Sequence, residues 1–462
     1  MTADFRASLS LRLQALLKTD FLRSVAVLTG GTASAQALPI LITPLLTRIY
    51  TPYDFSTLGV FLAVLGVMAV IVGGQYETAI PIPKQDETAA NLLGVALLCV
   101  ALTTGVSAIA VAFFRDEIAD LVRQRALAGL LWLLPIGLGG AGAYVTLQFW
   151  AVRNRAFPRI ARTRLTQASG GAVIQLFLGW GGAGALGLIT GQLFMSGAGF
   201  LGLGRGALKE DSLALRKITL SGMRKAAADF RRFPMYTAPE AFANAAAIQV
   251  PFLLVAQHAP GAEVGFLMLG MRLMQAPLSL IGSSVSQVYY AHAVTEHREG
   301  RLPGFTADVI GKLASVGVGP MIFAGILAPW VCGPVFGTGW QRAGVLIAWM
   351  TPWFVFQFLS SPVSQVLYVT SHQLTAMILQ TSGLILRVAI VLVAATGVGG
   401  HRVAEGYAVS GFVFYLVYLV VICRVAGVSM RLLTTSCRPA TVSAFYWTIG
   451  GLAVASLIRT LA

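Results

Sequence analysis

Two arginines lie deep inside long apolar stretches of the sequence, where a charge is costly. Arg272 lies about eight residues into the run 264–290, and Arg387 about fourteen residues into the run 373–396. At about 1.5 Å per helical residue, both are expected near the middle of a bilayer. A central arginine costs at least about 2.5–3.5 kcal/mol, so each should face a cavity or a partner. Because guanidinium stays charged and can bond two oxygens at once, both are candidate phosphate ligands, with a structural ion pair as the alternative.

Three further charged residues lie near the ends of apolar runs. Arg48 could bind substrate, but anchoring at the interface or pairing with Asp54 competes. Glu77 and Glu240 are candidates for proton or cation coupling, because the pKa of a carboxylate in a dry cavity can rise toward physiological values. Pairing with a nearby Lys or Arg competes for Glu77. A helix-start role competes for Glu240, which follows Pro239.

Amide side chains recur within the apolar runs and could bond the hydroxyls of a polar ligand, although some are expected to bridge helices instead. The candidate cavity-lining amides are Gln36, Asn244, Gln249 and Gln275, with Gln148, Gln175, Gln192, Gln287, Gln357, Gln365 and Gln380 as further members. The aromatic residues that could stack on sugar rings are Tyr76, Tyr289, Trp353 and Phe356, for which packing is the alternative.

The composition assigns the chain to the membrane class. Of its 462 residues 56% are hydrophobic and 11% are charged, against about 25% charged in a typical soluble domain. The net charge of +15 would suggest nucleic acid on a soluble surface, but the basic residues fall between apolar runs. No nucleic-acid partner is therefore predicted. The four cysteines and five histidines are dispersed, so neither a metal site nor a cofactor is predicted.

Twelve apolar runs are long enough to span a bilayer, which takes roughly 20 helical residues. The runs are 24–47, 56–80, 90–114, 126–152, 165–182, 184–204, 234–257, 264–290, 305–330, 342–369, 373–396 and 403–423. A further stretch, 440–458, could be a thirteenth span or an interfacial helix. Before the first run, residues 1–23 place leucines and phenylalanines beside basic residues, which suits a helix lying on an anionic leaflet; a basic tail is the alternative.

The longest polar connection divides the chain into two halves. Residues 205–233 follow the sixth run, so we expect an N-terminal lobe over 24–204, a C-terminal lobe over 234–423 and a tail over 424–462. The sequence PLLTRIYTPYDFSTLGVF from Pro44 resembles PFLLVAQHAPGAEVGFL from Pro251. Two parallel six-span repeats with a substrate site between them would explain the similarity, and chance similarity of apolar segments is the alternative.

Several segments resemble one family across most of the chain. They are 44–61, GGQYETAIPIPKQDETAANLL (73–93), FRRFPMYTAPEAFANAAAIQVPFLL (230–254), MRLMQAPLSLIGSSVSQVYYAHA (271–293) and FGTGWQRAG (336–344). These segments resemble the O-antigen and exopolysaccharide repeat-unit flippases of the multidrug/oligosaccharidyl-lipid/polysaccharide exporter superfamily. The resemblance implies an all-α polytopic membrane protein with two six-helix lobes in a V around a central cavity.

The resemblance also implies a function. The substrate would be an undecaprenyl-diphosphate-linked oligosaccharide, moved by alternating access from the cytoplasmic to the periplasmic leaflet of the bacterial inner membrane. Membrane lipid, a polysaccharide polymerase and a chain-length regulator are the expected partners, and the chain is not expected to be an enzyme.

A drug or cation antiporter of the same superfamily is the main alternative, but its cationic substrates would favour an acidic cavity. A membrane polymerase or glycosyltransferase would need catalytic carboxylates or a sizeable outward loop.

The distribution of Lys and Arg predicts the orientation. One side of the spans carries 24 of these residues, including those of the tail before the first span and of the connection 205–233, and the other side carries at most seven. By the positive-inside rule the first side is cytoplasmic. We therefore expect a topology reporter fused after Arg216 to score as cytoplasmic; a periplasmic score would overturn the orientation.

Overall fold

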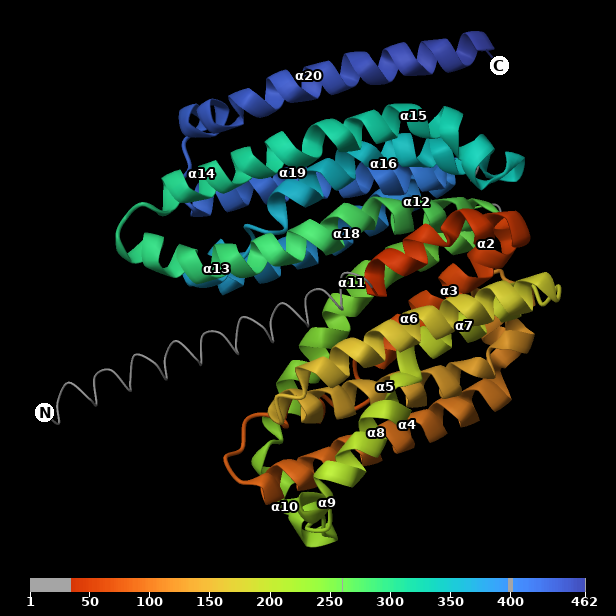
Figure 1. Cartoon of the computed structure of the whole chain (residues 1–462), viewed down its shortest axis with the longest axis vertical. Helices are drawn as coiled ribbons and strands as arrows, with labels where there is room; N and C mark the ends of the chain where they lie inside the picture. Colours follow the sequence, from red (N-terminus) through yellow and green to blue (C-terminus); the bar gives the residue numbers. More distant parts are fainter. Residues whose placement is uncertain (1–34, 260, 398–401, 462) are drawn as a thin grey trace, which may run out of the picture.

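The computed structural model describes residues 35–259, 261–397 and 402–461, and within these ranges the chain is helical with no strand (Figure 1). Residues 35–41 are helical, and the first half continues through α2 (Thr43–Ile49), α3 (Pro52–Ala69), α4 (Asp86–Leu121), α5 (Leu133–Arg153), α6 (Phe157–Trp180), α7 (Ala185–Gly197) and α8 (Gly199–Glu210). The predicted amphipathic segment 1–23 lies outside the described residues.

The second half is joined to the first through α9 (Ser212–Leu215) and α10 (Leu220–Asp229). It contains α11 (Ala238–His258), α12 (Glu263–Pro277), α13 (Ser283–Arg298), α14 (Leu302–Leu313), α15 (Gly319–Phe336), α16 (Gln341–Ser360), α17 (Val366–Val369), α18 (Gln373–Gly397), α19 (Val403–Val425) and α20 (Met430–Leu461). Short π-helical turns, η3 (Phe233–Thr237), η4 (Leu278–Gly282) and η5 (Ala314–Val318), precede α11 and join α12 to α13 and α14 to α15.

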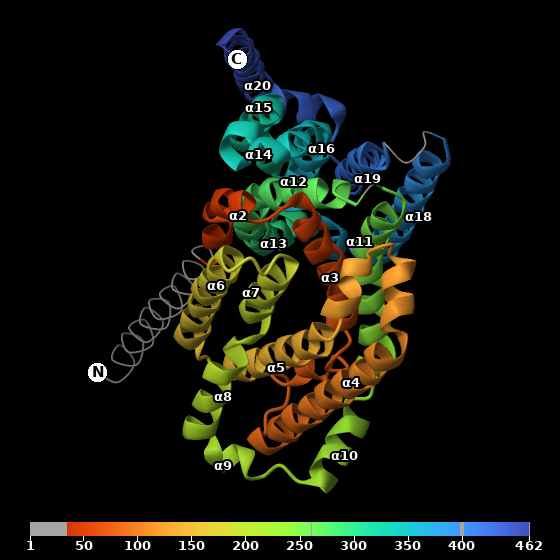
Figure 2. The same cartoon turned by 90° about the vertical axis from the view of Figure 1, so that its right-hand side faces the viewer.

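The helices form two lobes of a multi-pass membrane protein. Figure 1 shows α3–α8 in one lobe and α12–α19 in the other, with α11 passing between them. Within the described ranges, nine helical stretches are long and apolar enough to cross a membrane. One of them is α20, over residues 430–460, which packs on α14 and α15 at the far edge of the second lobe (Figure 2). The predicted all-α, two-lobed architecture is confirmed.

Local sequence explains why α3 begins at Pro52, directly after the short polar turn that follows α2. Thr51 caps α3: its side chain accepts a hydrogen bond from the Asp54 amide, and the Asp54 carboxylate accepts one from the Thr51 amide at 2.8 Å. Pro52 at the first helical position is preorganised for the helix and needs no amide partner there.

Helix α4 extends beyond the predicted run 90–114 at both ends and has non-helical angles at Phe114. Its polar ends continue the helix outside the apolar stretch.

The two lobes are in contact at one face of the molecule, which carries residues 48–54, 261–265 and 334–342. We call it the opposite face, because it lies across the molecule from the face that is rich in Lys and Arg. The Trp340 indole donates a hydrogen bond to the Thr47 carbonyl at 2.8 Å, and the Trp340 ring lies edge-on to Phe55 with centroids 4.9 Å apart. At Gly265 the backbone of α12 approaches α3 so closely that a Cβ would overlap the Pro52 carbonyl. Only glycine permits this approach.

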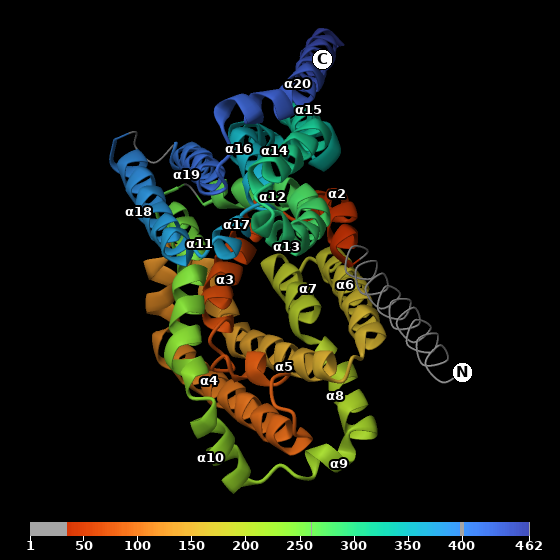
Figure 3. The same cartoon turned by 90° about the vertical axis from the view of Figure 1, so that its left-hand side faces the viewer.

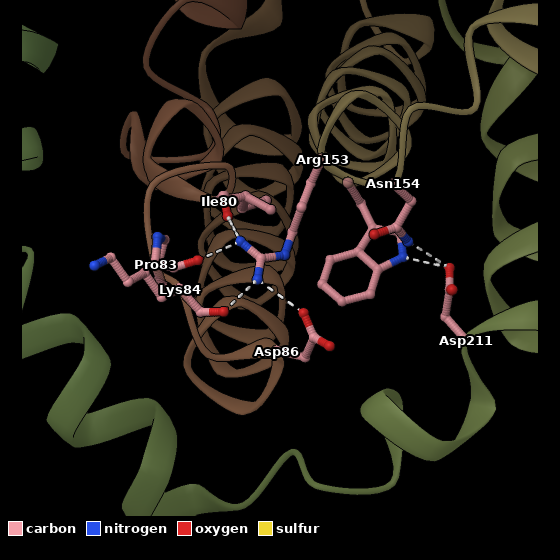
Figure 4. A network of polar contacts seen from close by, with 8 residues as sticks. Ile80, Pro83, Lys84, Asp86, Arg153, Asn154 and Asp211 are labelled. Atoms are coloured by element: carbon pink, nitrogen blue, oxygen red, sulfur yellow. Dashed lines mark hydrogen bonds and ion pairs between the residues drawn. The ribbon is translucent and has the colours of Figure 1, made fainter. Parts of the chain in front are cut away.

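The other face, which we call the basic face, carries residues 80–86, 153–157, 211–229 and 298–302. There Arg153 donates hydrogen bonds to the carbonyls of Pro83 (2.5 Å) and Lys84 (3.4 Å) and pairs with Asp86 at 2.8 Å (Figure 4). Asp211, at the start of the connection between the lobes, accepts from Trp150 and Asn154 (Figure 4). The Arg153 bonds join α5 to the start of α4, and the bonds to Asp211 hold the connection against the first lobe.

On the same face, the Thr219 amide donates to the Asn91 side chain at 3.0 Å, and the Tyr76 hydroxyl donates to the Ala227 carbonyl at 3.2 Å. Accordingly α9 and α10 both contact α4, and Figures 2 and 3 show α10 beside it. On this face α10 and α13 are far apart, whereas α3 and α12 are adjacent at the opposite face (Figure 1). The lobes thus diverge toward the basic face.

The close approach at Gly265 generates a prediction. A Gly265→Val side chain would force α12 away from Pro52 and so weaken the closed opposite face. We expect Thr47→Cys, at a position that is 4% exposed in the native chain, to react severalfold faster with a maleimide when Gly265→Val is present, in a background without the four native cysteines.

Gly304→Val is the matched control, because Gly304 is also helical but has no neighbouring atom within 4 Å of the point that a Cβ would occupy. An equal reaction rate in both variants would show that the glycine approach does not hold this face closed.

Candidate functional site

A cavity of about 920 Å³ lies between the lobes. Its walls come from residues 35–40 and from α3, α5, α6 and α7 on one side, and mainly from α11 and α12 on the other. Its charged and amide lining consists of Arg164, Arg272, Gln36, Gln148, Gln167, Gln192, Gln249 and Gln275. None of the lining residues that the structure describes is Asp or Glu. The cavity is therefore cationic and rich in groups that both donate and accept hydrogen bonds.

Arg272 reaches across the cavity between the two lobes. It lies seven residues after Gly265, so the helix rise places it about 10 Å from the lobe contact at the opposite face. Its Nη2 donates a hydrogen bond to the Pro39 carbonyl at 2.9 Å. No carboxylate in the described part of the chain forms an ion pair with it. The guanidinium charge is consequently available to an anionic ligand.

Arg164 and Gln167 are cavity residues that the sequence prediction missed. The prediction began this span at residue 165, which left Arg164 in a loop. In the structure α6 begins at Phe157, so Arg164 is seven residues inside the helix. Pro158 near the start of α6 is a helix-start signal that could have revealed this. The Gln167 side chain is 4% exposed, and its Nε2 has no hydrogen-bond partner among the described residues.

Arg387 does not line this cavity. Its side chain is buried in the second lobe among three aromatic rings, those of Phe414 (4.6 Å from the guanidinium carbon to the ring centroid), Tyr415 (5.6 Å) and Trp353 (5.8 Å). Aromatic faces attract a cation through their quadrupole. Trp353 itself lies against Phe354 and the edge of Tyr407, so in this structure it is a packing residue around Arg387.

Several other charged and amide residues that the sequence predicts as site residues lie outside the cavity. Arg48 is exposed and donates to the Pro334 carbonyl at 3.2 Å, which adds to the lobe contact. Asn244 and Glu240 are exposed on α11 and do not line the cavity. The amides outside the cavity lining are Gln175, Gln287, Gln357, Gln365 and Gln380. Of these, Gln175 bridges helices by donating to the Leu188 carbonyl at 3.1 Å.

The candidate aromatic residues also lie outside the cavity lining. Tyr289 bonds Thr306 at 2.9 Å and stacks on Phe305, and Phe356 lies edge-on to Phe412. Tyr76 is engaged with the connection on the basic face. In their place the lining includes Tyr144, Tyr407 and Phe252.

Glu77 lies in a short 3-10 turn, η1 (Tyr76–Ala79), between the spanning helices α3 and α4 and outside both. Its side chain is 5% exposed, and its Oε2 has no hydrogen-bond partner among the described residues. Oε2 lies so near Gly73 that a side chain at that position would overlap it. Burial raises the pKa of the Glu77 carboxyl above its ordinary value. The turn thus holds a carboxyl whose neutral form is favoured.

Comparison with known proteins places these features in a family. The sequence profile of polysaccharide biosynthesis proteins matches residues 45–344. The chain is 27% identical over 342 residues to the uncharacterized protein Rv1510 of Mycobacterium tuberculosis, covering 71% of this chain and 75% of that protein. It is 26% identical over 314 residues to the succinoglycan biosynthesis transport protein ExoT of Rhizobium meliloti, covering 65% of this chain and 59% of ExoT.

Solved structures share the fold at low sequence identity. The lipid II flippase MurJ in an inward closed conformation has a TM-score of 0.71 and 14% identity, covering 94% of this chain and 97% of MurJ. An inward-facing multidrug resistance MATE family transporter of the MOP superfamily has a TM-score of 0.64 and 17% identity, covering 86% and 95% of the two chains. The protein has the fold of these transporters and, since the profile match covers more than half of its length, it belongs to the family of polysaccharide biosynthesis proteins.

Proposed function

We propose that the protein is a flippase for a lipid-linked glycan. The observation that carries the proposal is the cavity between the lobes, which holds Arg272 and Arg164 and six glutamines but no acid among its described lining residues. The relatives with informative names are a succinoglycan transport protein and a lipid II flippase. Both names concern the movement of saccharides or lipid-linked material, and the fold likeness supports a carrier rather than an enzyme.

The proposed substrate is an undecaprenyl-diphosphate-linked oligosaccharide. Such a molecule must bring a pyrophosphate and a polar glycan past the low-dielectric core of the membrane, while its hydrocarbon tail can remain in lipid. Arg272 supplies a charge for phosphate oxygens inside a water-accessible space, and charge-assisted bonds of this kind are about twice as strong as neutral ones. The glutamine amides supply partners for sugar hydroxyls. The cavity volume of about 920 Å³ lies near the upper end of the range for ligand sites.

Transport would proceed by alternating access between the two lobes, for which we propose the boundaries 24–204 and 234–423. In the present structure the lobe contacts at Gly265 and Trp340 close the opposite face. If the Lys- and Arg-rich face is cytoplasmic, as the positive-inside rule implies, this is the state that loads substrate from the cytoplasmic leaflet of the inner membrane. Rocking of the lobes would then release it to the periplasmic leaflet, where a polymerase and a chain-length regulator would act on it.

The main competing function is drug or cation antiport, which the fold likeness to a multidrug transporter keeps open. A carrier of organic cations would have to place them beside Arg272 and Arg164, and like charges in a poorly solvated cavity repel strongly. The lining offers no described carboxylate to offset that repulsion. The charge of the cavity therefore favours an anionic substrate.

We further propose that Glu77, rather than the exposed Glu240, is the proton-coupling group. Glu77 is buried in the turn η1, which contacts the connection between the lobes through Tyr76. A change in its protonation would alter a charge next to the segment that links the lobes. This position suits a group that couples protons to lobe movement.

The Arg272 assignment predicts a specific loss of transport. Removing a charge-assisted bond of about 1.5–3 kcal/mol should weaken substrate binding about 10- to 100-fold. Arg272→Ala should therefore slow flipping of a fluorescent undecaprenyl-diphosphate glycan in vesicles by a similar factor at sub-saturating substrate, while Arg272→Lys should keep part of the activity because the charge remains.

Arg387→Ala serves as the comparison, because Arg387 is also a mid-depth arginine but does not line the cavity. We expect its effect to track the amount of folded protein rather than substrate affinity. Full activity of Arg272→Ala at normal protein levels would refute the proposed phosphate site.

The raised pKa of Glu77 predicts a pH-dependent stability. The folded protein binds this proton more tightly than the unfolded chain does, so the stability that the carboxyl contributes is present below its unfolded pKa of about 4.3 and is lost as the pH rises through the folded pKa. Glu77→Gln lacks this loss. We expect the variant to unfold at a higher temperature than the native chain at about pH 8 and at a similar temperature near pH 4.

In vesicles, Glu77→Gln should also flatten the dependence of flipping on a pH gradient, whereas Glu240→Gln should preserve it. An unchanged gradient dependence in Glu77→Gln, together with the expected stability shift, would exclude Glu77 as the coupling group without affecting the Arg272 site.

A further inference from the structure

A second cavity, of about 570 Å³, lies at the opposite face and shares no residue with the central cavity. It is bounded by the start of α3 at Tyr53 and Asp54, by η2 (Arg125–Leu130), by the turn between α6 and α7, and by Gly261 of the second lobe. Two cationic side chains, Arg123 and Arg125, contribute to its lining. The function proposed above makes no use of this cavity.

Arg123 occupies a backbone conformation that normally favours glycine. Its φ is 52°, in the left-handed region. It follows the last turn of α4, where its amide bonds the Asp120 carbonyl at 3.0 Å and the next amide, that of Gln124, bonds the Ala119 carbonyl at 2.9 Å. Helices that end this way usually place glycine at the left-handed residue. The backbone conformation at residue 123 therefore does not explain why an arginine stands there. A ligand for its charge in the adjacent cavity would explain it.

The loop that carries the two arginines is fixed to the first lobe by a buried amide. Gln124 is 8% exposed; its Nε2 donates to Ser56 Oγ at 2.6 Å, and its Oε1 accepts from Thr57 Oγ1 at 3.3 Å. Both partners lie on α3. Arg123 and Arg125 flank Gln124 directly, so their backbone positions relative to the cavity are set before any ligand binds. Such preorganisation reduces the entropy lost on binding.

The charges in this cavity are only partly compensated. Asp54 keeps its negative charge at the cavity wall, but its hydrogen bonds are made to Thr51 and it forms no ion pair with Arg123 or Arg125. Arg125 lies 3.5 Å from Asp120, but the two side chains are 92% and 64% exposed, and such pairs contribute little. Arg123 forms no ion pair with any residue that the structure describes. The cavity therefore offers an uncompensated guanidinium to solvent.

We propose that this cavity is a binding site for a small oxyanion, a carboxylate of an acidic sugar or a phosphate, with Arg123 as its principal ligand. Tyr53 is 63% exposed and gives the site an aromatic face on which a sugar ring can rest. The chemical class is thus an anionic saccharide or a free phosphate, which share the group that Arg123 would bind.

The site is complete only while the lobes meet at this face. Gly261 belongs to the turn between α11 and α12, and a Cβ on it would lie 2.7 Å from the Tyr53 ring. Separation of the lobes would remove this wall. A ligand that binds the complete site more tightly than the open one must shift the population toward the closed state. An oxyanion at this face would thereby hold the carrier closed there.

The test measures binding to the full chain in phosphatidylcholine nanodiscs, in the Arg272→Ala background, which removes the proposed phosphate ligand of the central cavity. Titration calorimetry with glucuronate, inorganic phosphate and uncharged glucose identifies the ligand. We expect at least one anion to bind and glucose to bind at least about tenfold more weakly. Binding of glucuronate alone assigns the site to acidic sugars, and binding of phosphate alone assigns it to phosphate.

Two substitutions of Arg123 separate binding from folding. Arg123→Gln should weaken anion binding by about tenfold or more, whereas Arg115→Gln, on the preceding helix α4 and outside the cavity, should not. Arg123→Gly should lose binding equally and yet unfold at the same or a higher temperature, because glycine adopts the left-handed conformation without strain. Unchanged anion affinity in either Arg123 variant would overturn the site, as would equal binding of glucose.

The link to lobe closure has its own readout. The bound anion should slow maleimide labelling of Thr47→Cys, and it should not do so in Arg123→Gln. An unchanged labelling rate in the presence of a bound anion would overturn the link. Because the two cavities share no residue, failure of this site would leave the Arg272 assignment intact, and loss of transport in Arg272→Ala would leave this site intact.

Discussion

The arrangement of the whole chain depends on the approach of two backbones at the opposite face, where α12 meets the start of α3. Gly265 allows the Pro52 carbonyl to come closer than any side chain would permit. The two segments belong to the hairpin corners whose sequences resemble each other, one after Pro44 and one after Pro251. A pseudo-twofold axis between repeated halves would bring such corners together. This contact fixes the apex from which the lobes diverge and so determines where the central cavity can form.

Arg272 and Arg387, the two arginines inside long apolar runs, show two ways in which a membrane protein can accommodate the same charge. Arg387 is covered by aromatic faces within one lobe, which lowers the cost of burial but leaves little access for a ligand. Arg272 bonds a single carbonyl across the lobe interface and faces a cavity. Acidic side chains pair with an arginine at the lobe contact instead. At the opposite face Arg342 bonds both Glu263 and Glu405, which joins the starts of α16, α12 and α19.

The sequence was sufficient to predict the helical membrane class and the two lobes, because the length of the apolar runs and the long polar connection between them are visible in it. It could not predict which way each side chain faces. That depends on neighbours distant in the chain, such as Phe414 for Arg387. It also assigned Arg164 to a loop, because the start of α6 is polar although helical. Asn244 was predicted to line the cavity for its amide alone, yet it lies on an exposed part of α11.

The glutamine lining of the central cavity has a consequence for selectivity. An amide can rotate to present either a donor or an acceptor, so six of them satisfy many different patterns of hydroxyl groups with similar energy. Guanidinium groups, in contrast, bind a phosphate more strongly than an uncharged hydroxyl. The proposed carrier therefore selects its substrate by the diphosphate group that lipid-linked glycans share, and not by the identity of their sugars. Such a carrier would remain useful when upstream enzymes change the glycan, so the polysaccharide can diversify without simultaneous change in the protein that exports it.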